Sequence, residues 1–359
     1  MLKDNSHLHL TNKNNPSERN KFHLELVYPI ICCIFAPREP PSLFTMLKSG
    51  VVFLYIPLLM SITFPKHYKT PEELVELLSE RGLYIHDKDS ACQYIKNIGY
   101  YRLSAYLYPF LKLPKENQLF KDGSTLEGAL MLYRFDKKMR MFLLNEIEKI
   151  EVAFRSTLAN MVAQETGNIF WMTDQAMFTH ADKFNRTMEK VKKEFEGSKE
   201  DFILHFKKKY SNAYPPAWML VEILPLGVIT RIFENLRDNA LKKMIAATFH
   251  LPLPVFCSWM TVITLTRNSC CHHSRVWNRT YAVGPMVPKR MNRPWIGNNI
   301  SHLKTFYEIC IIKWFIDIVS PDNNLKEHLT SLLASFPNID TKAMGFPEHW
   351  ELEPLWNNE

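Results

Sequence analysis

The stretch YRFDKKMRMFLLNEIEKIEVAFRSTLANMVA, residues 133–163, decides the fold class. It contains no glycine or proline over roughly eight helical turns. Leucine, methionine, lysine and glutamate, all good helix formers, recur through it. We predict an amphipathic helix from Leu126 to about Glu165. A helix of this length favours a helical protein over a sandwich or barrel.

Upstream of it, residues 70–83 carry the signals of a helix start and stop. Thr70 is placed to cap the helix, with Pro71 at the first helical position and Glu73 three residues after the cap. Gly82 is the predicted stop. The stretch 87–111 then predicts two more helices, so a small helical unit precedes the long helix.

The sequence downstream of the long helix is also helical in pattern, and we find no internal repeat and no strand. The scarcity of glycine, 11 residues in 359, agrees with this. We predict an all-α protein, a multi-helix bundle with a small helical N-terminal domain. The helices predicted downstream cover 182–210 as a pair, 229–251, 255 to about 280, 303–320 and 325–336.

These patterns suggest a division of the chain at residues 60, 126 and 321. Residues 60–125 form the helical N-terminal domain, 126–320 the main helical domain, and 321–359 a C-terminal helix and tail. Residues 1–59 differ, with two short apolar runs broken by Pro29 and Pro57. Both runs are shorter than the roughly 18 to 20 residues that a membrane helix needs. We therefore expect no membrane association, and we favour a translation start at Met46 or Met60.

The net charge bears on the partners of the protein, and the cysteine content on its cellular compartment. The formal net charge of +7 allows an acidic partner without requiring one. The seven cysteines are odd in number, and two pairs of them are adjacent in sequence. This pattern is typical of reduced thiols rather than of a disulfide framework, so we expect a cytoplasmic protein.

The stretch TLTRNSCCHHSRVWNRT, residues 264–280, holds the residues with the most chemistry. On a helix running from Val255 to Arg279, an apolar arc takes up His273, together with Trp259 and Cys270. The opposite, polar arc contains Arg267, Asn268, His272, Arg275 and Arg279.

This geometry weighs against two kinds of site. Zinc needs four ligands converging on one point, whereas Cys270, Cys271, His272 and His273 spread around the helix. A Cys271–His272 nucleophile pair lacks an orienting third residue and an oxyanion loop. We therefore expect no metal and no cofactor.

Phosphodiester chemistry fits the polar arc better. A histidine moves a proton near neutral pH, and an arginine binds a phosphate and stabilises charge that develops on it. Arg267 and His272 lie 140° apart, by five steps of about 100° each, so one helix does not aim both at a single atom. Two copies of the helix across a two-fold axis would form a composite cleft. The alternative is a surface or interface stripe with no catalytic role.

A second polar stripe lies on the long helix itself. Glu148, Glu151 and Arg155 are three and four residues apart, and Glu151 with Arg155 makes a favourable pair. The stripe is either a solvated face or a polar cluster that supports an active site.

The segment RNSCCHHSRVWNR resembles the signature of the Abi family of bacterial abortive-infection proteins, the AbiD/AbiF-like group. Three further blocks are similar to the family in the same order: residues 70–110, 132–159 and 215–236. Two positions depart from its pattern, Cys271 before the motif histidine and Leu226 before Gly227.

The resemblance implies membership of the HEPN superfamily, whose R-x4-6-H motif is the active site of metal-independent ribonucleases. From the polar arc, Arg275 and Arg279 are the expected ligands of RNA phosphates, and from the spacing on the long helix Arg155 joins Glu151 as a supporting residue. The resemblance implies Arg267, Asn268 and His272 as catalytic residues, with Glu148 and Glu151 as supporting glutamates. It also implies RNA rather than DNA as the partner, and a homodimer. A non-catalytic RNA-binding or toxin–antitoxin-type interaction module, or a purely structural dimerisation helix, stays open as an alternative.

Overall fold

A computed structural model describes residues 67–281, 283–297 and 299–357. The predictions made for residues 1–59 and for the start at Met46 or Met60 lie outside these residues. Within them the chain forms twelve α-helices, with three isolated β-bridges and no sheet, so the all-α prediction is confirmed. None of these helices is long and apolar enough by itself to cross a bilayer, although α9 (Asn239–Thr248) and α10 (Leu253–Cys271), bent by 65°, pass that test as a pair.

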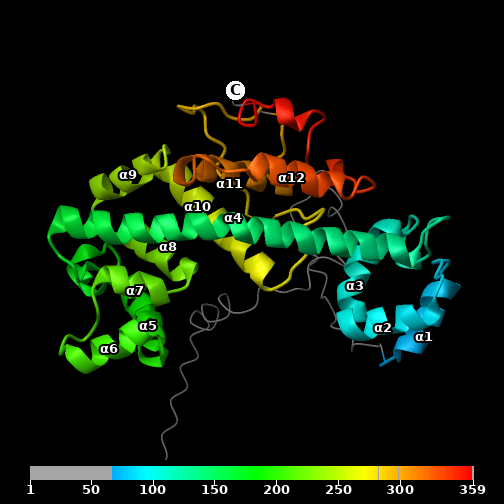
Figure 1. The fold of residues 1–359 in the computed structure, drawn as a ribbon, viewed down its shortest axis with the longest axis horizontal. Coiled ribbons are helices and arrows are strands. Elements are labelled where there is room, and N and C mark those ends of the chain that lie inside the picture. Colours follow the sequence, from blue (N-terminus) through cyan, green and yellow to red (C-terminus); the bar gives the residue numbers. More distant parts are fainter. Residues whose placement is uncertain (1–66, 282, 298, 358–359) are drawn as a thin grey trace, which may run out of the picture.

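The long helix α4, Leu126–Thr166, organises the molecule (Figure 1). Its predicted bounds, Leu126 to about Glu165, are confirmed. Thr125 caps the start by accepting a hydrogen bond from the N–H of Gly128, and Gly167 ends the helix in a left-handed conformation. At 1.5 Å per residue, α4 is about 60 Å long. It is therefore long enough to run through both parts of the molecule.

The N-terminal part sits at one end of α4 and has its own apolar cluster. It contains α1 (Pro71–Glu80), α2 (Lys88–Ile98) and α3 (Tyr100–Leu107). The predicted capping box is present, because Thr70 and Glu73 each accept a hydrogen bond from the other's backbone N–H. The cluster also takes in the first turn of α4 through Leu126 and Leu130. This shared turn joins the small unit to the rest of the protein.

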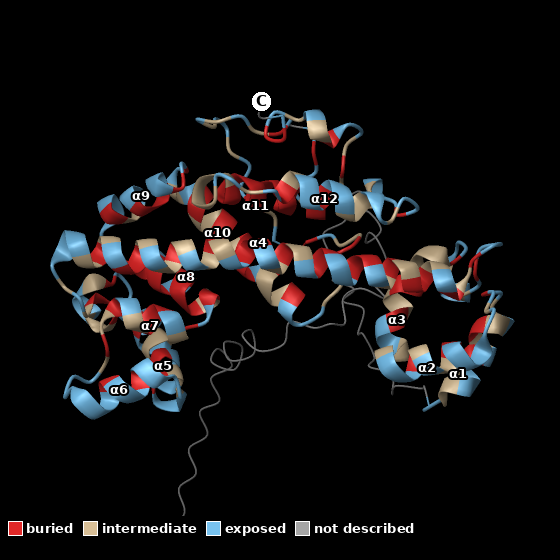
Figure 2. Ribbon diagram, in the orientation of Figure 1, coloured by how far each residue is buried: buried red, intermediate tan, exposed pale blue. Residues whose placement is uncertain are grey.

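The main body packs along the remainder of α4. Figure 1 shows α11 (Thr305–Val319) and α12 (Leu325–Ala334) along one side, with α10 (Leu253–Cys271) crossing α4. The other helices are α5 (Ala181–Gly197), α6 (Asp201–Lys209), α7 (Ala217–Ile223), α8 (Leu226–Asn235) and α9 (Asn239–Thr248). Figure 2 shows that α11 is buried on most sides, as expected of a central helix.

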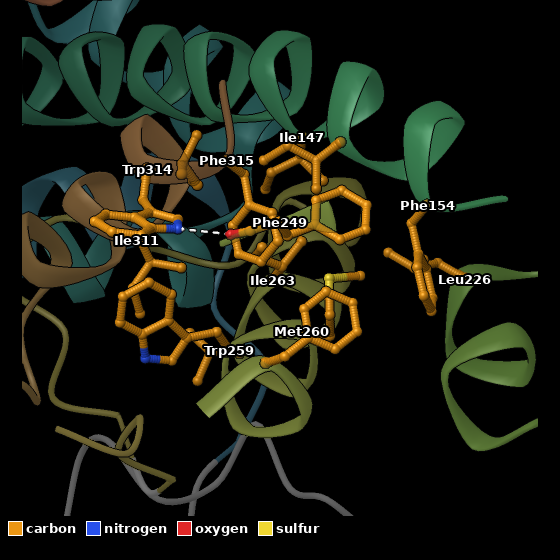
Figure 3. Close-up of a cluster of buried hydrophobic side chains, with 14 of the residues drawn as sticks. Ile147, Phe154, Leu226, Phe249, Trp259, Met260, Ile263, Ile311, Trp314 and Phe315 are labelled. Atoms are coloured by element: carbon orange, nitrogen blue, oxygen red, sulfur yellow. Dashed lines mark hydrogen bonds between the residues drawn. The ribbon is translucent and has the colours of Figure 1, made fainter. Parts of the chain in front are cut away.

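Aromatic rings fill the core where α4, α8, α10 and α11 meet (Figure 3). Phe256 on α10 is fully buried. The buried indole N–H of Trp314 donates to the carbonyl of Phe249 at 3.0 Å, so its polar atom is satisfied. The side chains of α12 and the C-terminal segment join this same core through Leu325 and Trp356.

The single helix predicted over 229–251 is instead two helices, and that prediction is wrong. Asp238 starts α9 by accepting hydrogen bonds from the N–H groups of Ala240 and Leu241. Asn235 ends α8 by exchanging two hydrogen bonds with the backbone of His180. A local cap and a tertiary contact together override the continuous helical pattern.

The helix predicted to run from Val255 to about Thr280 is also wrong at its end, because α10 stops at Cys271. His273 adopts a left-handed conformation with φ 58°. Its N–H donates to the carbonyl of Cys270 at 3.0 Å, and the N–H of Ser274 donates to that of Ser269 at 2.8 Å. These two bonds define a Schellman motif. Glycine usually fills the left-handed position, so the sequence carries no stop signal there.

Candidate functional site

The end of α10 holds the three residues that the sequence singled out. Arg267 and Asn268 lie in the last turns of the helix, and His272 is the residue that caps it. The N–H of His272 donates to the carbonyl of Asn268 at 2.9 Å, which places the two residues one turn apart. His272 is exposed, while Arg267 and Asn268 are half-buried. The motif therefore stands at the surface, at the open end of a helix.

Arg267 forms an ion pair with the long helix α4. Its Nε lies 3.6 Å from Oε2 of Glu151 on α4. Glu151 also pairs with Arg155, as the spacing predicts, and Arg155 donates to the backbone carbonyl of Val221 on α7. The Glu151 and Arg155 side chains are only 13% and 11% exposed, so this ion-pair chain is largely sheltered from solvent screening. It connects α7, α4 and the motif helix.

Glu148, the third member of the predicted stripe, does not take part in this ion-pair chain. It is exposed on α4, one turn before Glu151. The stripe is thus divided, with Glu151 and Arg155 beside the motif and Glu148 facing solvent.

Three residues of the motif region lie elsewhere than the helical wheel predicts. His273, expected in the apolar arc, is exposed. Arg275 and Arg279, expected on the stripe of His272, lie beyond the end of the helix. The wheel is wrong past Cys271 because the chain leaves the helical path there.

The guanidinium groups of the two displaced arginines bind groups of the protein. Arg275 donates to the carbonyl of Ala105 on α3 at 2.7 Å. Arg279 donates to the hydroxyl of Ser269 at 2.9 Å and lies over the ring of Tyr281. Both thus bind neighbouring segments in this structure.

A buried polar network, not predicted from the sequence, lies under the motif. Asp136 on α4 is fully buried and pairs with Arg140. It also accepts a hydrogen bond from the hydroxyl of Tyr106 at 2.6 Å. Burial raises the pKa of the Asp136 carboxyl, whereas Arg140, Tyr106 and two backbone N–H groups lower it. The sequence does contain a hint of this network: Asp136 and Arg140 are four residues apart, on the face of α4 that its apolar residues bury.

A second missed group is Glu308 on α11, which is buried and accepts a hydrogen bond from Thr266 at 3.0 Å. Burial raises its pKa to about 8, against 4.5 for an ordinary glutamate. Glu308 lies in a strongly apolar segment of the sequence, and a single carboxylate in such a segment predicts a buried polar group. Glu308 thus contacts Thr266, the residue immediately before Arg267.

The two adjacent cysteines of the motif differ in their exposure to solvent. Cys270 is buried and Cys271 is exposed, and the five cysteines within the described residues are unpaired with one another. Across the described parts of the chain, no three side chains among His, Cys, Asp and Glu gather closely enough to bind a metal ion.

Fold and site together define an all-α protein with an Arg-Asn pair and a histidine at the exposed end of one helix. The chain belongs to the Abi-like protein family, whose family model matches residues 93–278, more than half of the sequence. The matched region runs from α2 through α4 to the residues just after the motif. Membership supports a role in abortive infection. No curated protein and no solved structure matches the chain.

Proposed function

We propose that this protein is a metal-independent endoribonuclease of the HEPN type that acts in abortive infection. One observation carries the proposal: the ion pair with Glu151 holds Arg267 in the turn of α10 before the exposed His272. Cleavage of a phosphodiester needs both a positioned cation for the phosphate and an exposed group that transfers a proton.

Arg267 binds the scissile phosphate. Its contact with Glu151 uses Nε, the nitrogen nearest the aliphatic stem. The two terminal nitrogens form the fork that matches a phosphate in a bidentate bond, and no other described residue bonds to them. Glu151 thus orients the guanidinium without covering its binding edge.

His272 transfers the proton, and Asn268 orients the histidine or the phosphate. As a base, His272 removes the proton of the ribose 2′-OH, whose oxygen then forms a bond to phosphorus. The bond from phosphorus to the 5′-oxygen breaks, that oxygen takes up a proton from water, and His272 returns the proton it removed to the solvent. The products are a 2′,3′-cyclic phosphate and a 5′-hydroxyl.

A second copy of the chain completes the cleft. Arg267 is drawn toward α4 by Glu151, whereas His272 stands exposed at the helix end. In a symmetric dimer, the arginine of one copy faces the histidine of the other across the two-fold axis. RNA is the partner in this proposal, and the homodimer is the active form.

The direct test is RNA digestion in the presence of EDTA by the wild type, His272→Ala and His273→Ala. We expect the wild type and His273→Ala to cut and His272→Ala to be inactive. Equal cleavage by all three would reject His272 as the catalytic residue, and a requirement for Mg²⁺ would reject the metal-free mechanism. Copurified RNA that stays intact would instead favour the RNA-binding alternative.

Subunit mixing tests the composite cleft. Arg267→Ala and His272→Ala are each expected to be inactive, but a mixed dimer of the two retains one cleft with both residues. Equal mixing should restore roughly a quarter of wild-type activity, because half of the dimers are mixed and each has one intact site. No recovery from a mixture shown to exchange subunits would place both residues of a site in one chain.

A further inference from the structure

The carboxylate of Asp136 binds the backbone just beyond the motif. Its Oδ1 accepts hydrogen bonds from the N–H of Val276 at 3.0 Å and of Trp277 at 2.6 Å. Its Oδ2 is used by Tyr106 and Arg140. Four donors thus surround a fully buried carboxylate, which satisfies the usual requirement for burying such a group.

Two arginines bind carbonyls of the same segment. Arg102 on α3 donates to the carbonyl of His273 at 2.7 Å. Arg140 on α4 lies 3.5 Å from the carbonyl of Ser274, at the outer limit of a hydrogen bond. The segment 273–277 is therefore held both from the N-terminal part and from the long helix.

These contacts compete with a longer α10 for the same backbone groups. In a continued helix, the N–H of Val276 would donate to the carbonyl of His272, and that of Trp277 to the carbonyl of His273. Asp136 takes both N–H groups, and Arg102 takes the carbonyl of His273. The Schellman motif already uses the N–H groups of His273 and Ser274, and these further contacts take the groups that the following turn would need, so the helix does not resume beyond Cys271.

We propose that Asp136, Arg140 and Arg102 are positioning residues for His272. By binding residues 273–277 they prevent the motif helix from resuming beyond Cys271 and keep His272 at its exposed end, with no further turn covering it. The catalytic meaning of this role rests on the proposed function. The N-terminal unit, through Arg102, thereby contributes to the geometry of a site that lies in another part of the fold.

The test compares Asp136→Asn and Arg102→Ala with a matched control, Arg134→Ala. In Asp136→Asn an amide NH₂ replaces one carboxylate oxygen, so the side chain can no longer accept from all four of its donors. Arg102→Ala removes one contact near the surface and does not threaten the core. Arg134 also joins α4 to the N-terminal unit, through the hydroxyl of Tyr94 at 3.0 Å, and makes none of the contacts to residues 273–277 described above.

Three quantities are measured on the full chain: amide hydrogen exchange over residues 272–279, the NMR signals of the His272 ring, and kcat and KM for RNA cleavage. In both test variants we expect exchange at Val276 and Trp277 to rise about tenfold or more. The His272 signals should move, and kcat should fall about 10- to 100-fold with little change in KM. Arg134→Ala should leave all three at wild-type values.

Unchanged exchange and unchanged His272 signals in both test variants would overturn the positioning role. So would faster exchange with an unaltered kcat in an active protein, or equal effects in the Arg134→Ala control. A wild type that cuts no RNA would reject the proposed function alone. In that case exchange and the His272 signals still decide whether the network positions the histidine.

Discussion

Glu151 of α4 and Arg267 of α10 form an ion pair, with Oε2 and Nε 3.6 Å apart, that joins two helices predicted independently from the sequence. The pair brings residues separated by more than a hundred positions to one site. It also distinguishes Glu151 from Glu148, which lies exposed on the same stripe.

This distinction gives a direct prediction. Glu151→Gln removes the charge that orients Arg267, so we expect kcat/KM for RNA cleavage to fall by about tenfold. Glu148→Gln makes the same change of charge at the exposed position and should alter kcat/KM by less than about twofold. Equal losses would indicate a general charge effect on RNA binding instead of an effect on Arg267.

A second prediction concerns the two adjacent histidines. His273 is exposed and has φ 58°, a conformation that glycine adopts without strain. His273→Gly should therefore stabilise the protein by about 0.5 to 1 kcal/mol in urea unfolding and leave RNA cleavage intact. His272 has φ −85°, so His272→Gly relieves nothing and should abolish cleavage. Loss of activity in His273→Gly would contradict the assignment of His272 alone.

A third prediction is a pH dependence of stability set by Glu308. Its pKa is about 8 in the folded protein and near the ordinary 4.5 in the unfolded chain. Between these values the folded state holds a proton that the unfolded state releases, so stability falls as pH rises from about 4.5 to about 8. Above about 8 both states are ionised and the loss is complete.

Glu308→Gln keeps an oxygen for Thr266 but cannot ionise. Its free energy of unfolding should exceed that of the wild type by a margin that grows with pH, reaching on the order of a few kcal/mol near pH 8. Chemical denaturation at several pH values measures this margin. Glu148→Gln is the control and should show none, and a constant margin for Glu308→Gln would show that ionisation of Glu308 is not the cause.

A fourth prediction concerns the aromatic core. The ring of Phe256 packs against four other rings whose centroids lie 5.2 to 6.1 Å from its own: Phe154, Phe233, Phe249 and Phe315. Phe256→Ala should destabilise the protein by about 3 to 5 kcal/mol, since it leaves a cavity between packed helices. The exposed Met244 serves as control, and Met244→Ala should change stability by less than about 0.5 kcal/mol. Similar losses for both would contradict the packing described.

The local signals in the sequence predict the helices well where the helix ends are set locally. The capping box at Thr70 and the glycine after α1 predict the bounds of α1 within two residues, and the absence of glycine and proline from the middle of α4 predicts that it is unbroken. The break between α8 and α9 is different, because Asn235 ends α8 through hydrogen bonds to His180, a residue far away in the sequence.

For the site, the sequence by itself determined that Arg267 and Asn268 share the last turns of one helix and that Glu151 pairs with Arg155, because residues within two helical turns are placed by the helical repeat. Only the tertiary structure decided where α10 ends and which groups surround it. His273 carries no stop signal, and the N–H groups of Val276 and Trp277 are taken by Asp136, a residue 141 positions before Trp277. The turn that would follow Cys271 does not form because Asp136 takes the N–H groups of Val276 and Trp277, and Asp136 is brought near them only by the folding of the chain.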